Sequence, residues 1–276
     1  MGEIMYKDVL ITIKNDIAYI TLNRPKYGNS ISLSFAKELL KVAIECDQNK
    51  DIRCVVLSAK GALFSAGGDI GEMNVFKDQI SIFLSELAGI LHLAISRFIR
   101  MDKPLLVAID GTAAGAGMGL ALMGDLVIAT PKAKFIPAYS ALGLSPDAGL
   151  TWILPKLVGL RKAQQILFTN KMLNAEEACH SGLVTEIYSG DDFDSYVNEI
   201  ANRLTEQPNP AISNVRRLLL ESHQNNFETH LELEARAIAS VSEHSSSKEG
   251  LDSYINKRTP NFKAVNVKGD EIDQGQ

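Results

Sequence analysis

Apolar residues along this chain follow two spacings, one typical of buried strands and one typical of amphipathic helices. Short runs rich in β-branched and other apolar residues predict strands, which we place at 9–13, 17–22, 53–58, 104–109 and 126–129. Only residues 14–16 separate the first two runs, which predicts a hairpin. Ser32 or Ser34 can cap a helix with apolar residues at helical spacing, and a second, long helix is expected over 79–100.

The order of these elements predicts the fold class. Strand, turn and helix recur with long crossover connections, which implies parallel strands in an α/β core. From about Arg161 onward the pattern becomes helical, with helices expected at 161–169, 174–178, 192–206, 211–221 and 227–241. We therefore predict an α/β core over residues 1–205 and a helical oligomerisation or lid region over 206–276, with the last dozen residues frayed.

Composition and charge narrow the class of protein. Of 276 residues, 46% are hydrophobic and 22% are charged, which is ordinary for a soluble globular protein. A net charge of −5 argues against a nucleic-acid surface, and charged residues interrupt the apolar region 104–129, so no membrane span is expected. The start of the chain lacks the apolar core of a signal peptide. The three cysteines and five histidines show no disulfide or metal spacing. These features predict a cytoplasmic protein with reduced cysteines and without a metal, nucleic-acid or membrane partner.

Two turns rich in small residues follow predicted strands. They span 61–69 and 110–119, and the apolar segment 120–123 after the second suits a fully buried helix. Small residues let backbone N–H groups approach a ligand, and two such donors can stabilise negative charge on one oxygen atom. The alternative is that the small residues only allow a helix to pack closely on the sheet. A dinucleotide site is not expected, because Leu120 stands where that fingerprint needs its last glycine.

Short segments along nearly the whole chain resemble those of the crotonase (enoyl-CoA hydratase/isomerase) superfamily. They are residues 20–25, 29–30, 64–70, 103–104, 113–117, 124–125, 143–147, 154–155, 178–184 and 257–262. Each segment alone is a weak signal, but their order and spacing together are strong. The resemblance implies an α/β fold built as a crotonase-like spiral of ββα units with a helical C-terminal layer. It also implies a homotrimer or a dimer of trimers.

The same resemblance implies a substrate and the residues that bind it. The substrate would be an acyl-CoA thioester, and no separate cofactor is expected, because coenzyme A is part of that substrate. By resemblance, the N–H groups of Gly68 and Ala116 form an oxyanion hole for the thioester oxygen. The resemblance assigns CoA and acyl binding to Arg24, Lys26, Ser30, Ala66, Ile70 and Tyr139.

Departures from the family pattern bear on the reaction. Family hydratases use two glutamates, and the matching positions here carry Gly119 and Tyr139. Hydration needs one group to deprotonate water and another to protonate carbon, so this pair does not favour it. Asp147 matches a working carboxylate of several isomerases and of a dehalogenase, and residues 143–152 most resemble the ring-epoxide isomerase branch of bacterial phenylacetate breakdown. An isomerase in which Asp147 moves a proton along an enolate is therefore the favoured prediction.

Other interpretations stay open at this stage. Asp147 could hold water for hydration, or act as a nucleophile in hydrolysis or dehalogenation. The chain could also bind acyl-CoA without turning it over, and Asp147 could only cap a helix that begins near Thr151. Asp69 is expected to be a structural cap, and His92 to pack. The loop and helix at 74–100 are expected to line the acyl end of the pocket, with an apolar face made of Ile82, Phe83, Leu87 and Ile90.

Overall fold

A computed structural model describes residues 6–269, with side chains up to residue 265. It contains a six-stranded sheet in the order β1-β2-β3-β5-β7-β10 and a four-stranded sheet in the order β4-β6-β8-β9. The strands are β1 (Val9–Lys14), β2 (Ile17–Leu22), β3 (Cys54–Ala59), β4 (Leu63–Ser65), β5 (Leu105–Ile109), β6 (Thr112–Ala114), β7 (Leu126–Ala129), β8 (Lys134–Ile136), β9 (Leu173–Asn174) and β10 (Glu186–Ile187).

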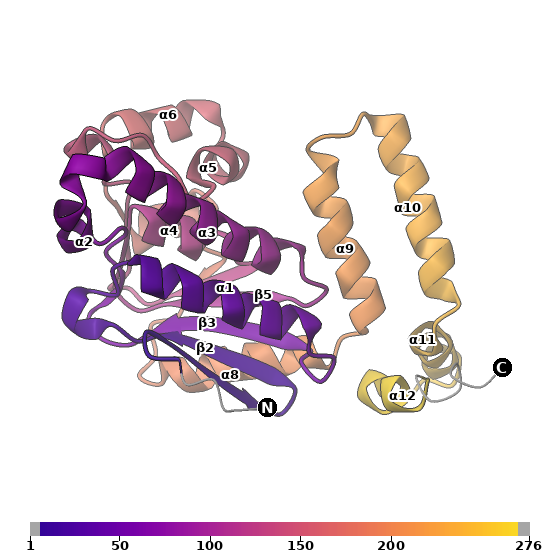
Figure 1. The fold of residues 1–276 in the computed structure, drawn as a ribbon. Coiled ribbons are helices and arrows are strands. Elements are labelled where there is room, and N and C mark those ends of the chain that lie inside the picture. Colours follow the sequence, from indigo (N-terminus) through magenta and orange to yellow (C-terminus); the bar gives the residue numbers. More distant parts are fainter. Residues whose placement is uncertain (1–5, 270–276) are drawn as a thin grey trace.

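Helices cover the sheets and form the C-terminal part of the chain (Figure 1). They are α1 (Leu33–Gln48), α2 (Ile70–Val75), α3 (Ile80–Arg100), α4 (Ala116–Leu122), α5 (Leu150–Val158), α6 (Leu160–Phe168), α7 (Ala175–His180), α8 (Phe193–Thr205), α9 (Asn209–Ser222), α10 (Phe227–Ser242), α11 (Ser245–Ile255) and α12 (Phe262–Gly269). Short 3₁₀ turns are η1 (Pro25–Tyr27), η2 (Lys77–Gln79) and η3 (Ser140–Leu142).

The six-stranded sheet confirms the predicted hairpin and the predicted parallel core. β1 and β2 pair antiparallel, with Asn15 and Asp16 in left-handed conformations at φ 53° and 65° in the turn. β2, β3, β5, β7 and β10 then pair in parallel, so that helices must cross from one strand to the next.

Both faces of this sheet are buried. One face lies under α1 and α3, and the other under α8 (Figure 1). Along β3 the side chains alternate accordingly, with Val55 and Leu57 on the first side and Cys54 and Val56 on the second. Burial on both faces explains why the central strands are continuously apolar.

Helix α3 follows the predicted amphipathic pattern, and its buried stripe belongs to the hydrophobic core. Phe83 and Leu87 are buried in the hydrophobic core, where α3 packs against α1. Burying each such side chain contributes about 1.5–3 kcal/mol. Their expected place in the lining of an acyl pocket stays a prediction. Ile82, in contrast, is 69% exposed.

The segment that contains α3 is also the one helical segment, within residues 6–269, that is long and apolar enough to cross a membrane. It spans Lys77–Arg100, with a mean hydropathy of 1.6. Six of its side chains are buried in the core, where α3 packs against α1.

The four-stranded sheet was not expected from the sequence. Its strand β6 and the first turn of α4 lie inside the segment 110–119, which we predicted to be a turn throughout. Its strands have only two or three residues each, which is too short for an alternating pattern to show.

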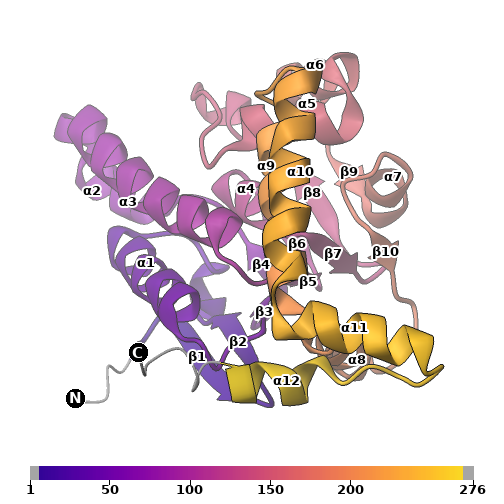
Figure 2. The ribbon, with the colours of Figure 1, turned by 90° about the vertical axis from the view of Figure 1, so that its right-hand side faces the viewer.

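The C-terminal helices confirm the predicted helical character of this region. Helices α9 and α10 run beside each other and extend away from the sheets, and α11 and α12 follow below them (Figures 1 and 2). Helix α12 continues to Gly269, so the expectation that the last dozen residues are frayed is wrong up to that residue. Residues 270–276 lie outside the described part of the chain. The proposed boundary between 1–205 and 206–276 stays a prediction.

Candidate active site

The two turns rich in small residues lie against each other because the strands that precede and enter them are neighbours. β4 pairs in parallel with β6, with Ser65 opposite Ala113. Parallel strands end at the same edge of a sheet, so the segments that follow them meet there. Gly67 is one of the glycines at this contact. It has φ +88°, and a Cβ atom on it would lie 2.8 Å from the carbonyl oxygen of Ala114. Both facts require glycine at this position.

The N–H group of Gly68 is left free by the bonds around it. Ile31 donates its N–H to the oxygen of Gly67 at 2.7 Å, and Asp69 donates to the oxygen of Ile31 at 3.1 Å. In this parallel bridge the groups on either side of Gly68 bind Ile31, so the N–H of Gly68 itself points away from that strand.

The second predicted donor, Ala116, is the first residue of α4. Its N–H therefore has no acceptor within the helix. Gly115, which precedes it, has φ 53° and ψ −128°, a backbone conformation that essentially only glycine adopts. The structure brings the turns of Gly68 and Ala116 together, because a Cβ on Gly67 would lie 3.4 Å from the nitrogen of Ala116. Their role as an oxyanion hole stays a prediction.

Helix α4 is buried over its whole length and touches the Asp147 loop through a glycine. A Cβ atom on Gly119 would lie 2.6 Å from both the Cβ atom and the carbonyl oxygen of Ala148. Any larger side chain at 119 must therefore displace that loop. The space beside Gly119 is filled by Ala148, the residue next to Asp147.

Asp147 and Tyr139 form a hydrogen-bonded pair. The hydroxyl of Tyr139 donates to Oδ1 of Asp147 at 2.5 Å, and both side chains are half-buried. Burial and then the negative charge of Asp147 raise the pKa of Tyr139 above its ordinary value of 10. The phenol therefore stays protonated and acts as a donor. The sequence reasoning placed Tyr139 in the wall of the pocket and missed this bond.

The structure also tests the interpretation of Asp147 as a helix cap. Helix α5 begins at Leu150 with Gly149 as its N-cap, and no side chain caps it. Only the main-chain oxygen of Asp147 takes part, accepting from the N–H of Leu150 at 3.0 Å. The carboxylate of Asp147 does not cap α5, so that interpretation is wrong.

His92 makes a contact that was not expected. Its Nε2 atom accepts a hydrogen bond from the backbone N–H of Ala148 at 3.0 Å. The imidazole therefore touches the residue that follows Asp147, from a helix 56 positions earlier in the chain. The expectation that His92 only packs is incomplete, and no pattern in the sequence signals a contact between such distant residues.

Apart from Tyr139, the residues assigned to CoA and acyl binding divide into two groups. Arg24 and Ser30 are held inside the protein, because both donate hydrogen bonds to Oδ2 of Asp69 at 3.0 Å. Arg24 also lies 3.7 Å from the carboxylate of Asp8. The other three, Lys26, Ala66 and Ile70, are exposed, and Ala66 donates its N–H to the oxygen of Gly28, next to the turn of Lys26. Contact of any of the five with CoA stays a prediction.

Asp69 is confirmed as a structural cap. Its Oδ1 accepts the N–H of Glu72 at 3.1 Å and caps α2. Burial alone would raise the pKa of Asp69, but the bonds from Glu72, Ser30 and Arg24 outweigh it and hold the pKa below its ordinary value. Asp69 is thus an ionised anchor for this loop and not a proton acceptor.

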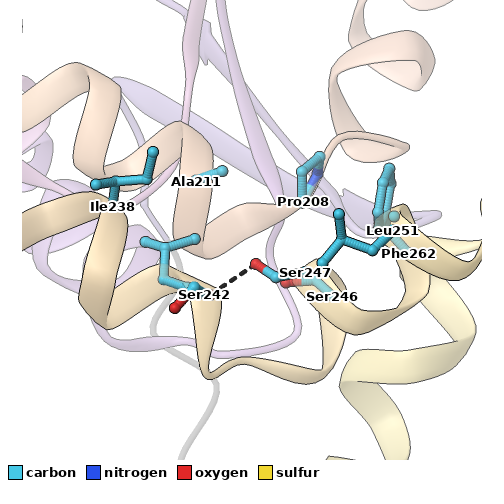
Figure 3. A pocket seen from close by; sticks show the side chains of 10 residues that line it. Pro208, Ala211, Ile238, Ser242, Ser246, Ser247, Leu251 and Phe262 are labelled. Atoms are coloured by element: carbon cyan, nitrogen blue, oxygen red, sulfur yellow. Dashed lines mark hydrogen bonds between the residues drawn. The ribbon is translucent and has the colours of Figure 1, made fainter. Parts of the chain in front are cut away.

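Within residues 6–269, no three histidine, cysteine or acidic side chains lie close enough together to hold a metal ion. Burial raises the pKa of Cys46 and Cys54 to about 12. A cavity of about 390 Å³ lies among the C-terminal helices and is lined by Pro208, Ala211, Ile238 and Phe262 among others (Figure 3). It is at the end of the molecule opposite α5, so it is separate from the site around Asp147 (Figures 1 and 2).

Comparison with known proteins identifies the family. The sequence model of the enoyl-CoA hydratase/isomerase family matches residues 12–265. The chain belongs to this family. The enzyme is 30% identical to the 1,2-epoxyphenylacetyl-CoA isomerase of Escherichia coli, over 94% of this chain and 99% of that protein. It is 34% identical to the 4-chlorobenzoyl coenzyme A dehalogenase-2 of an Arthrobacter species, over 82% of each chain. This family member also superposes on an enoyl-CoA hydratase from Polaromonas with a TM-score of 0.87 and 28% identity, covering 91% of this chain and 98% of that one. The predicted crotonase fold is confirmed.

Proposed function

We propose that this enzyme is an acyl-CoA isomerase that shifts a carbon–carbon double bond, or isomerises a ring epoxide, in a CoA thioester. The observation that carries the proposal is the single carboxylate of Asp147, bound by the phenol of Tyr139, beside two turns that offer free backbone N–H groups. Gly119 and Tyr139 occupy the two positions where family hydratases carry glutamates. The similarity to an epoxyphenylacetyl-CoA isomerase supports the same class of reaction.

The proposed mechanism is a proton transfer through an enolate. One oxygen of Asp147 removes a proton from the carbon next to the double bond, and the electron pair moves through the conjugated system to the thioester oxygen. The N–H groups of Gly68 and Ala116 stabilise this oxyanion, each by about 3–4 kcal/mol. Asp147 then returns the proton to the far carbon, so the double bond moves and no atom is gained or lost. Tyr139 holds Oδ1 and leaves Oδ2 for the proton.

We expect coenzyme A to enter only as part of the substrate, with its adenine end near Lys26, Ser30, Ala66 and Ile70. A cytoplasmic homotrimer or dimer of trimers is the form in which we expect the enzyme to act. Hydration is the second candidate reaction, and the similarity to the Polaromonas hydratase supports it. A family member that binds acyl-CoA without turnover is the third.

Incubation of the purified protein with 2-enoyl-CoA, 3-enoyl-CoA and a ring-epoxide CoA ester in deuterated water separates these candidates. For an isomerase we expect deuterium uptake with a shifted double bond or rearranged ring, read by mass and ultraviolet absorbance. Asp147→Asn should leave the Kd for the ester unchanged and lower kcat by about 10²–10⁴-fold, because it removes the acid/base group. The matched control Asp191→Asn, at an exposed position, should behave as wild type.

Two results would contradict the proposal. A product heavier by one water would make the protein a hydratase. Tight binding of every ester without exchange or turnover would leave a binding protein.

A further inference from the structure

We infer that His92 and Asn170 are positioning residues, which orient Asp147 and Tyr139 by holding two alanines in a left-handed backbone conformation. The effect on turnover rests on the proposed function, whereas the effect on the geometry of the loop does not.

The two alanines flank the hydrogen-bonded pair. Ala138 immediately precedes Tyr139 and has φ 63°, and Ala148 immediately follows Asp147 and has φ 53°. A residue with a Cβ atom disfavours positive φ, because the Cβ crowds the backbone. At functional sites such conformations persist only where the surroundings enforce them.

A side chain from a distant element binds the N–H group of each alanine. His92, on α3, accepts from Ala148 at 3.0 Å. Asn170, which follows α6, accepts from Ala138 through Oδ1 at 2.7 Å. These acceptors lie 56 and 32 positions away in the sequence, and both bonds are partly buried. Each half of the catalytic pair thus has its own anchor outside the loop.

The geometry explains why these anchors matter for the pair. Rotation of Ala148 to negative φ would swing the preceding Asp147 and would also break the close contact of Ala148 with Gly119. Rotation of Ala138 would likewise redirect Tyr139. The 2.5 Å hydrogen bond between Tyr139 and Asp147 forms only when both side chains keep their present directions.

The contact of His92 also defines what its side chain must provide. Nε2 accepts a hydrogen bond from the N–H of Ala148. The side chain must therefore provide a lone pair at that position, and it needs no exchangeable proton. Glutamine can place its Oε1 near the position of a histidine Nε2, and aspartate can replace the Oδ1 of Asn170. These two substitutions keep the acceptor, which separates positioning from acid/base chemistry.

Four variants test the inference. His92→Ala and Asn170→Gly remove the acceptors, and glycine also tolerates the φ of 51° at position 170. His92→Gln and Asn170→Asp retain them. Ser96→Ala, on the exposed side of α3, is the control. Crystal structures report φ at 138 and 148 and the distance from the Tyr139 hydroxyl to Asp147, and kinetics with whichever CoA ester the wild type converts report kcat and Kd separately.

We expect His92→Ala and Asn170→Gly to lengthen the Tyr139–Asp147 distance beyond hydrogen-bond range and to lower kcat about ten- to hundredfold at unchanged Kd. The acceptor-retaining variants should recover the distance and most of kcat. An unchanged loop in both acceptor-free variants would overturn the inference. So would a His92→Gln enzyme as impaired as His92→Ala, which would assign His92 a chemical role. The structural readout needs no turnover, so it distinguishes failure of this inference from failure of the proposed isomerase.

Discussion

Close contacts determine which residue type fits at several positions of the site. Gly119 is one of them, because α4 meets the Asp147 loop there with no space for a side chain. The same contact leaves no space for a larger side chain, such as that of glutamate, at position 119. Gly89, in the middle of α3, is the opposite case, since a Cβ atom there would meet nothing within 4 Å.

These two glycines give a paired prediction for stability. Gly119→Ala should lower the free energy of unfolding by about 1–3 kcal/mol, because overpacking forces Ala148 to move. Gly89→Ala should raise it by about 0.5–1 kcal/mol, because alanine restricts the unfolded chain and favours a helix. Urea unfolding at equal protein concentration measures both. Equal effects of the two substitutions would mean that Ala148 does not fill the space beside Gly119.

At the scale of elements, helix α9 is attached to the core through Arg216. Its guanidinium donates to the carbonyl oxygens of Phe98 and Met101 at the end of α3, and Nε lies 2.7 Å from Asp125. The last carbonyls of a helix favour a cation, so this side chain binds the C-terminal end of α3. Only 8% of the side chain is exposed.

Arg216→Ala should therefore release α9 and α10 from the core while the sheets remain folded. Removing the guanidinium leaves the carbonyl oxygens of Phe98 and Met101 without their donor, which costs about 1–3 kcal/mol, and the loss falls on the attachment of one element. Hydrogen exchange should show faster exchange in 209–242 and unchanged protection in β3 and β5. Arg217→Ala is the control, since Arg217 is exposed and bonds only Asn214, in its own helix. Unchanged exchange after Arg216→Ala would show that α9 is held by other contacts.

At the scale of the molecule, the C-terminal helices expose several large apolar side chains. They include Phe227, Ile238, Leu251, Tyr254 and Ile255, and Ile238 is 74% exposed. Helix α9 buries none of its residues, and α10 buries only Ala237. Soluble monomers rarely leave large apolar patches uncovered, so we expect these helices to meet other copies of the chain.

The oligomeric state follows as a prediction. Light scattering after size exclusion should give three or six times the chain mass of 30.1 kDa. Ile238→Glu should shift the protein toward smaller species, because a buried carboxylate without a partner opposes association. Val75→Glu is the control, since Val75 is equally exposed but lies on α2, away from the C-terminal helices. A monomeric wild type would contradict the expected assembly.

The sequence predicted the elements that carry a long periodic pattern. The hairpin of β1 and β2 and the helices α3, α9 and α10 all follow from spacing that persists over several residues or turns, whereas α11 and α12 were not predicted individually. The four-stranded sheet did not follow, because its strands have two or three residues each. The place of Phe83 and Leu87 in an acyl pocket stays a prediction, since a pattern shows that a face is apolar but not which surface covers it.

The sequence by itself determined the type of each long element, the family, and Asp147 as the carboxylate to examine, because these depend on the identity and spacing of neighbouring residues. Only the tertiary structure decided that Tyr139 binds Asp147, that His92 reaches Ala148, and that Ala148 closes the space beside Gly119. These contacts depend on the direction of loops, and two alanines with positive φ set that direction against their own preference. A local sequence pattern does not predict such a conformation, because side chains distant in the sequence impose it.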